Sequence, residues 1–258
     1  MFFLLPGIWA HFGNILYGNQ FTYMKSYYHR SKSLANSFLF ILPLLVLYEV
    51  GIAMQGSGIK NTADVVIKTP LLLFGKNGSL IFNLLVIAFL FVSVFYIEKE
   101  YRFSSLIFIP MLMEGAVYAL FVGYVLGFVV YEVLYPLALA KPFSTNMWQG
   151  IVLSVGAGVY EEIVFRLLLI TLLYFIFTKL LKIKKPLSAI ASVLIGALIF
   201  TSVHYIGTLK DSFTYASYTF RLLSGLVLSA IFMSRGLGVV VYTHAIYDVL
   251  TILKPFHI

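Results

Sequence analysis

The chain has 258 residues, of which 61% are hydrophobic and 11% are charged, with a mean hydropathy of +0.97; these values exclude an ordinary soluble domain and predict a polytopic membrane protein. Cysteine is absent, which excludes disulfides, thiolate metal sites and a cysteine nucleophile. The net charge of +8 is scattered over short connections, which argues against a nucleic-acid partner and favours contact with anionic lipid headgroups.

The first eighteen residues are apolar but lack the basic region and cleavage site of a signal peptide, so they predict an interfacial or re-entrant segment. Residues 62–78 are apolar but interrupted, which suits a surface-lying or re-entrant piece. A bilayer core needs roughly 20 apolar residues per helix. About seven transmembrane helices are therefore expected, near residues 35–54, 79–97, 104–137, 147–178, 187–206, 218–233 and 237–253.

The fold class that follows is an all-α membrane helix bundle. The third and fourth stretches are longer than a bilayer requires, so these helices must tilt, kink or protrude. No linker, repeat or low-complexity tract divides the sequence. Residues 1–258 are therefore predicted to form a single integral membrane domain.

Ionisable residues inside the hydrophobic stretches indicate function, because each costs about 2 to 3 kcal/mol or more at a helix centre unless it is paired or hydrated. Glu49, Glu114 and Glu132 receive no role from the sequence: they can line a polar path or lie at wet helix ends. The remaining residues of this kind fall on three late stretches, and they are Glu161, Glu162, Arg166, His204, His244 and Asp248.

The segment EEIVFR holds the densest charge. Glu162 and Arg166 are four residues apart, so they share a helical face and are predicted to form an ion pair. Glu161 is turned about 100° from Glu162, which leaves it free for another role. The small residues Ser154 and Gly158 precede it at a spacing that lets another helix approach closely.

Two histidines complete the group. His204 follows Phe200 by four residues, which places both on one helical face. His244 and Asp248 have the same spacing, so the carboxylate can accept a hydrogen bond from one ring nitrogen and fix the tautomer that the other nitrogen presents.

The three motifs Glu-Glu-x-x-x-Arg, Phe-x-x-x-His and His-x-x-x-Asp, in this order, resemble those of the CPBP superfamily, also called Abi proteins, which includes the type II CAAX prenyl endopeptidases. The resemblance covers residues 147–253, where the catalytic helices are expected. It implies a glutamic-type intramembrane endopeptidase of bacterial or archaeal membranes that cleaves a membrane-tethered polypeptide, prenylated or carrying a C-terminal tail.

The resemblance also implies roles for individual residues. Glu161 and His204 would activate water, Glu162 would hold Arg166, and His244 and Asp248 would stabilise the oxyanion. An ionised Asp248 can only accept hydrogen bonds, so we expect it to orient His244 instead.

Two alternatives stay open at this stage. The same carboxylates and histidines can ligate zinc, although the HExxH pattern is missing, and the leading expectation is catalysis without a cofactor. A proton-coupled carrier, an immunity protein or a binding scaffold can use the same buried groups without proteolysis. Convergence of Glu161, His204 and His244 around one water-sized site would favour hydrolysis over a relay.

Overall fold

The computed structural model describes residues 27–55, 105–134, 146–206 and 212–253, and also residues 61, 63–65, 75, 85, 88 and 92. Over these residues the regular structure is entirely helical, which confirms the predicted all-α bundle. The predicted N-terminal segment, most of residues 62–78 and nearly all of the helix expected at 79–97 lie outside the described residues.

The described helices follow the hydrophobic stretches closely. Five are long and apolar enough to cross a membrane, and α10 is a shorter apolar helix, so the chain is an integral membrane protein. The elements are α2 (Leu34–Gln55), η2 (Ser105–Ile107), α5 (Phe108–Leu120), η3 (Phe121–Leu126), η4 (Phe128–Leu134), α6 (Met147–Gly156), η5 (Ala157–Ile170), α7 (Thr171–Phe175), η6 (Ile176–Leu180), α8 (Lys185–Val203), α9 (Tyr215–Arg235) and α10 (Leu237–Leu253).

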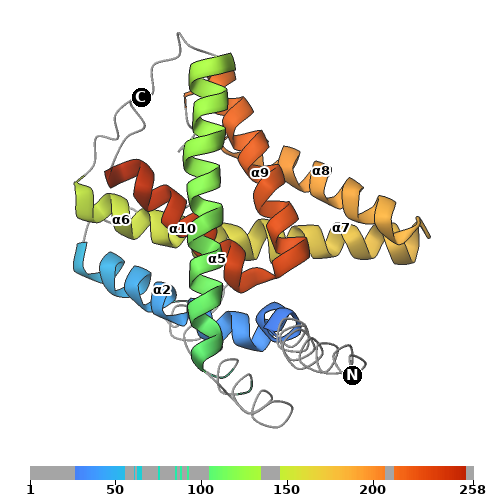
Figure 1. The fold of residues 1–258 in the computed structure, drawn as a ribbon, viewed down its shortest axis with the longest axis horizontal. Coiled ribbons are helices and arrows are strands. Elements are labelled where there is room, and N and C mark those ends of the chain that lie inside the picture. Colours follow the sequence, from blue (N-terminus) through green and yellow to red (C-terminus); the bar gives the residue numbers. More distant parts are fainter. Residues whose placement is uncertain are drawn as a thin grey trace, which may run out of the picture.

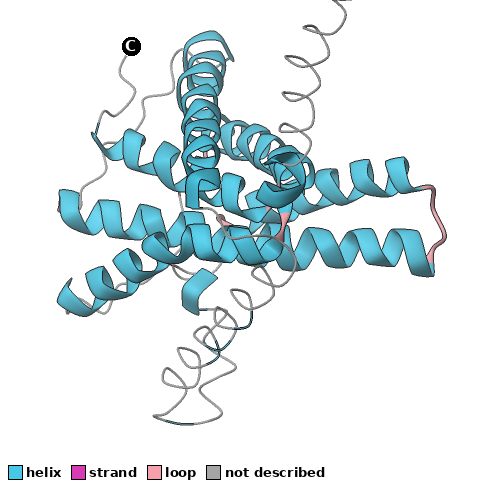
Figure 2. Ribbon diagram, turned by 60° about the horizontal axis from the view of Figure 1, so that its bottom comes forward, coloured by secondary structure: helices cyan, strands magenta, loops and turns pink. Residues whose placement is uncertain are grey.

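The longest helix joins α6, η5, α7 and η6 into one segment of 34 residues. A regular α-helix of this many residues would be about 51 Å long at 1.5 Å per residue. The π-helical turns rise less per residue, but the segment still exceeds a hydrocarbon core of roughly 30 Å. Its second half forms a hairpin with α8, and the two extend side by side away from the other helices (Figures 1 and 2). The turn closes through a hydrogen bond from Ile183 N to Phe177 O, 2.8 Å. The expectation that this helix must tilt or protrude agrees with the observed length.

The site-bearing part of this helix is widened. Residues Ala157–Ile170, which include Glu161 and Arg166, have π-helical hydrogen bonding between residues five apart. Such bonding occurs frequently at functional sites. It changes the angular spacing of side chains from that of the regular α-helix assumed from the sequence.

Helix α10 lies at the centre of the described bundle, in contact with α2, α5, α6, η5 and α9 (Figure 1). Gly158 makes the contact with η5 possible. A Cβ atom there would lie 2.6 Å from Ala245 Cβ and 2.7 Å from Ala245 N, distances that real Cβ atoms do not reach. The close approach predicted from Ser154 and Gly158 is thereby confirmed, and the helix it brings near carries His244.

Glu114, which the sequence left unassigned, belongs to an ion-pair cluster away from the motifs. It accepts hydrogen bonds from Arg235 Nε at 2.7 Å and Arg235 Nη2 at 2.8 Å. Tyr27 donates a further hydrogen bond of 2.7 Å to the same carboxylate, and Arg235 Nη2 reaches Ser31 Oγ at 3.1 Å. Burial, together with the bond to Glu114, raises the pKa of Tyr27 above its usual range. Three segments of the chain meet at this cluster.

The other two unassigned carboxylates differ from each other. Glu49 accepts a hydrogen bond of 2.5 Å from Tyr160, which joins α2 to η5. Glu132 is exposed.

Candidate active site

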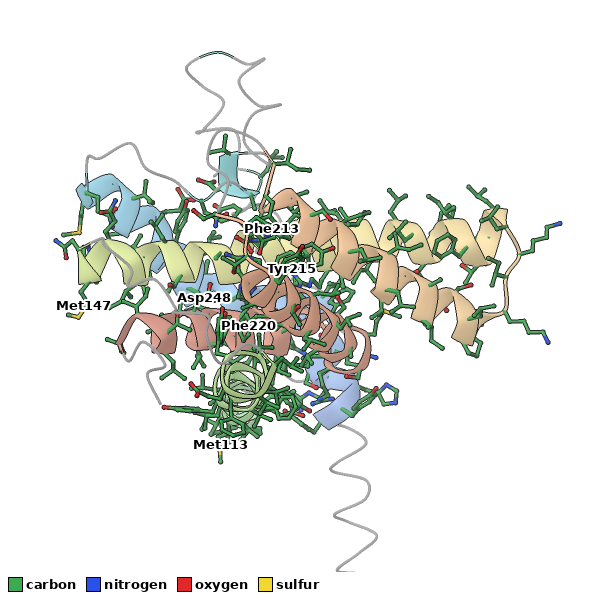
Figure 3. The ribbon with its side chains drawn as sticks, turned by 90° about the horizontal axis from the view of Figure 1, so that it is seen from above. Met113, Met147, Phe213, Tyr215, Phe220 and Asp248 are labelled. Atoms are coloured by element: carbon green, nitrogen blue, oxygen red, sulfur yellow. The ribbon has the colours of Figure 1, made fainter. Side chains whose placement is uncertain are left out.

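A cavity of about 370 Å³ lies between the helices that carry the three motifs. Residues of α6, η5, α8, α9 and α10 line it, and Asn61 lines it from outside these helices. Asp248 and Phe220, both on its wall, lie within the group of helices in the view from above (Figure 3). The predicted site residues Glu161, His204, His244 and Asp248 all face this cavity.

Glu161 is the carboxylate at the meeting point of the histidines. Its Oε2 atom lies 3.8 Å from His204 Nε2 and 4.0 Å from His244 Nε2. Its Oε1 atom accepts a hydrogen bond from Asn61 Nδ2 at 3.0 Å. The side chain is 12% exposed, so it is largely shielded yet open to the cavity.

His204 caps the C-terminal end of α8. Its Nδ1 atom lies 2.8 Å from the Phe200 carbonyl oxygen. A carbonyl can only accept, so Nδ1 carries a proton, and in the neutral form of the ring the acceptor nitrogen is Nε2, which faces Glu161. The helical face shared by Phe200 and His204 is confirmed by their ring centroids, which are 4.8 Å apart.

Glu162 and Arg166 form the ion pair expected from their spacing, with 3.0 Å between Oε1 and Nη1. Both side chains are buried, and the Arg166 guanidinium stacks over the Phe200 ring at 4.2 Å from its centroid. Phe200 therefore contacts both the arginine of the first motif and the histidine of the second.

Glu162 has a second partner that the sequence did not predict. His244 Nδ1 lies 2.6 Å from Glu162 Oε1, while Asp248 Oδ2 lies 3.5 Å from His244 Nε2. The closer contact with the ring is thus made by Glu162, on η5, rather than by Asp248 on the same helix as His244. Spacing could reveal the Asp248 contact but not a contact between residues 82 positions apart.

Sequence reasoning also missed one residue of the site, Asn61. It belongs to none of the motifs, and the only signal is a short polar run, residues 60–64, between apolar stretches. Such runs mark most connections and do not single out a functional side chain.

Zinc, the alternative cofactor, would need Glu161 and the two histidines at the spacing of tetrahedral ligands. Tetrahedral ligands at zinc distances lie about 3.4 Å apart, whereas Glu161 lies 3.8 and 4.0 Å from the histidine nitrogens. Within the described ranges, no three His, Asp or Glu side chains come close enough to hold a metal ion. In this arrangement these side chains do not form a metal shell.

Comparison with known families adds an independent observation. Residues 143–250 match the type II CAAX prenyl endopeptidase Rce1-like family. The resemblance predicted from the motifs is therefore confirmed, and the matched segment contains all of the predicted site residues. A match to this family supports a CAAX-type intramembrane peptidase as the general class of activity. Searches of curated proteins and of solved structures gave no match.

Proposed function

We propose that the chain is an endopeptidase that hydrolyses a peptide bond of a membrane-tethered polypeptide, with Glu161 and His204 activating the attacking water. The observation that carries the proposal is convergence. Glu161 lies within 4.0 Å of a ring nitrogen of each histidine, at the wall of one cavity. A proton relay would instead spread these groups along a path.

The tautomer of His204 gives the proposed activation a specific geometry. Water has two hydrogens, and the site offers two acceptors, the Glu161 carboxylate and the unprotonated His204 Nε2. Their separation of 3.8 Å suits one water that donates a hydrogen bond to each. Such a water keeps its lone pairs free for attack on a carbonyl carbon.

The reaction then balances within the side chains present. Glu161 takes a proton from water as the new C–O bond forms, and returns it to the leaving amine as the C–N bond breaks. A ring with protons on both nitrogens can donate from Nδ1 to Glu162 and from Nε2 to the developing oxyanion. We assign this role to His244. Asp248, whose Oδ2 lies 3.5 Å from His244 Nε2, contacts the same side of the ring and supports its orientation.

The proposed substrate is a lipid-modified polypeptide with its scissile bond near the membrane. The matched family is described as acting on prenylated CAAX sequences. The cavity lies among apolar helices, so a lipid anchor in the bilayer would hold a peptide beside it. A C-terminal tail without a prenyl group is the second substrate form to be compared.

The test is cleavage of farnesylated and unprenylated tethered peptides by the protein in vesicles, with product masses giving the cut site. Glu161→Gln and His204→Ala are each expected to lower kcat/KM by roughly 10²- to 10⁴-fold, the usual worth of positioned acid–base groups. Glu132→Gln is the matched control, because it makes the same change at an exposed carboxylate, and it should cleave normally.

Chelation separates the remaining alternative. Activity is expected to survive EDTA and phenanthroline. Loss on chelation with recovery on adding zinc would contradict metal-free activation, and full activity of Glu161→Gln would contradict the role of the glutamate. If wild-type protein cleaves no peptide while proton flux responds to Glu161→Gln, the carrier alternative replaces the proposal.

A further inference from the structure

Asn61 reaches the active-site carboxylate from the half of the chain that precedes the matched family segment. It lies 100 positions before Glu161, outside any helix, and it lines the catalytic cavity. Neither the motifs nor the family match, which begins at residue 143, assigns it a role.

The orientation of the Asn61 amide is fixed by its own surroundings. The backbone N–H of Ala63 donates to Oδ1 at 2.8 Å, so this position must be the oxygen. The remaining amide atom, Nδ2, therefore is the donor that faces Glu161 Oε1 at 3.0 Å. The usual ambiguity between amide oxygen and nitrogen does not arise here.

Two further bonds hold the backbone of Asn61 in place. Its N–H donates to the Tyr48 hydroxyl at 3.2 Å, and that hydroxyl donates to Asp64 Oδ2 at 3.0 Å. Tyr48 is fully buried on α2, and Asp64 is buried as well. The side chain that meets Glu161 is thus anchored to a packed helix rather than to a loose connection.

The two carboxylate oxygens of Glu161 have different partners. Oε1 accepts from Asn61, while Oε2 faces His204 and His244. We propose that Asn61 is a positioning residue that fixes the Glu161 carboxylate, so that Oε2 alone is presented to the attacking water. The inference rests on the proposed role of Glu161 as the water-activating carboxylate.

The expected effect falls on turnover. Asn61 acts through Glu161, so its loss should lower kcat and leave KM nearly unchanged. Asn61→Asp keeps the size of the side chain and the acceptor for Ala63, but it replaces the donor by a second carboxylate oxygen. We expect it to lower kcat by roughly 10- to 100-fold, as for other groups that orient a reacting side chain.

The experiment measures kcat and KM for tethered-peptide cleavage, and thermal unfolding, with full-length protein in vesicles or micelles. Asn61→Gln, which retains an amide donor, should recover part of the lost kcat. Asn146→Asp is the matched control: it makes the same change at an exposed residue, keeps the acceptor for the backbone N–H of Trp148, lies outside the lining of the cavity around Glu161, and should cleave normally.

The outcomes separate the inference from the proposed function. Wild-type kcat in Asn61→Asp, beside an inactive Glu161→Gln, overturns the role of Asn61 alone. Active Glu161→Gln overturns both. If Asn61→Asp loses thermal stability together with kcat and Asn61→Gln recovers neither, Asn61 serves the local fold, and the inference is also overturned.

Discussion

Glu162 connects two parts of the site through a single oxygen atom. Its Oε1 lies 2.6 Å from His244 Nδ1 and 3.0 Å from Arg166 Nη1, and neither Glu162 nor Arg166 is solvent-accessible. A buried charge left without its partner is far costlier than a missing pair. The ion pair therefore makes the position of His244 depend on the fold around η5.

Removal of one charge from this pair is predicted to destabilise the protein strongly. Glu162→Leu leaves Arg166 buried without its ion-pair partner, and a loss of about 3–5 kcal/mol in unfolding free energy is expected. The double variant Glu162→Leu with Arg166→Leu should be more stable than either single variant. Unfolding in detergent micelles measures all three, and additive losses would contradict coupling between the two charges.

The residue scale also shows where sequence reasoning stops. The contacts of Glu162 with Arg166 and of His244 with Asp248 follow from a spacing of four on one helix. The contact of Glu162 with His244, and that of Asn61 with Glu161, depend on which helices meet and at what height. No periodicity within a single segment carries that information.

At the scale of elements, the site depends on how closely α10 approaches η5. Gly158 lies against Ala245, the neighbour of His244, with no room for a methyl group. Gly158→Ala should push the two helices apart, destabilise the protein by about 1–3 kcal/mol, and lower kcat because His244 moves away from Glu161 and Glu162.

Gly127→Ala supplies the control for this prediction, since a Cβ atom at residue 127 would meet nothing within 4 Å. It makes the same change within a transmembrane helix and should alter neither stability nor cleavage. The measurements are thermal unfolding and peptide cleavage on the same preparations. A Gly158→Ala variant with normal stability and turnover would show that the close approach is dispensable.

Most helices could be predicted from hydrophobic length alone, because a bilayer imposes a minimum apolar run on each. The six expected stretches that fall within the described ranges each contain a helix. The π-helical bonding of η5 was not predicted, because the argument from residue spacing assumes a regular α-helix of 3.6 residues per turn. The count of seven spans stays a prediction, because the stretch at 79–97 lies almost wholly outside those ranges.

At the scale of the whole molecule, a second polar cluster joins segments that lie outside the three motifs. Glu114 on α5 and Arg235 at the end of α9 form two hydrogen bonds, and Tyr27 joins them from 87 positions away. Sequence reasoning assigned no role to Glu114 and did not predict its contact with Arg235. Because Tyr27 and Arg235 both bind the Glu114 carboxylate, the cluster indicates a structural contact between segments rather than a substrate path.

If the cluster around Glu114 is structural, variants that weaken it should lower the stability of the protein without lowering the rate of cleavage. Glu114→Gln removes the charge from hydrogen bonds to a guanidinium, and bonds of this kind contribute about 1.5–3 kcal/mol. Since Arg235 is largely buried, the unfolding midpoint in micelles should fall clearly. Tyr27→Phe removes one bond and should cost about 1 kcal/mol. Below the unfolding temperature both variants should keep the wild-type kcat.

Glu132→Gln is the control for this comparison. It removes the same charge at an exposed residue and should leave the unfolding midpoint unchanged. A fall in kcat for Glu114→Gln at unaltered stability would place Glu114 on the substrate path instead. The two results cannot be confused, because one moves only the temperature of unfolding and the other only the rate of cleavage. With the expected results, the chemistry of the molecule belongs to one polar cluster, around Glu161, and the stabilising contacts between distant segments belong to another, around Arg235.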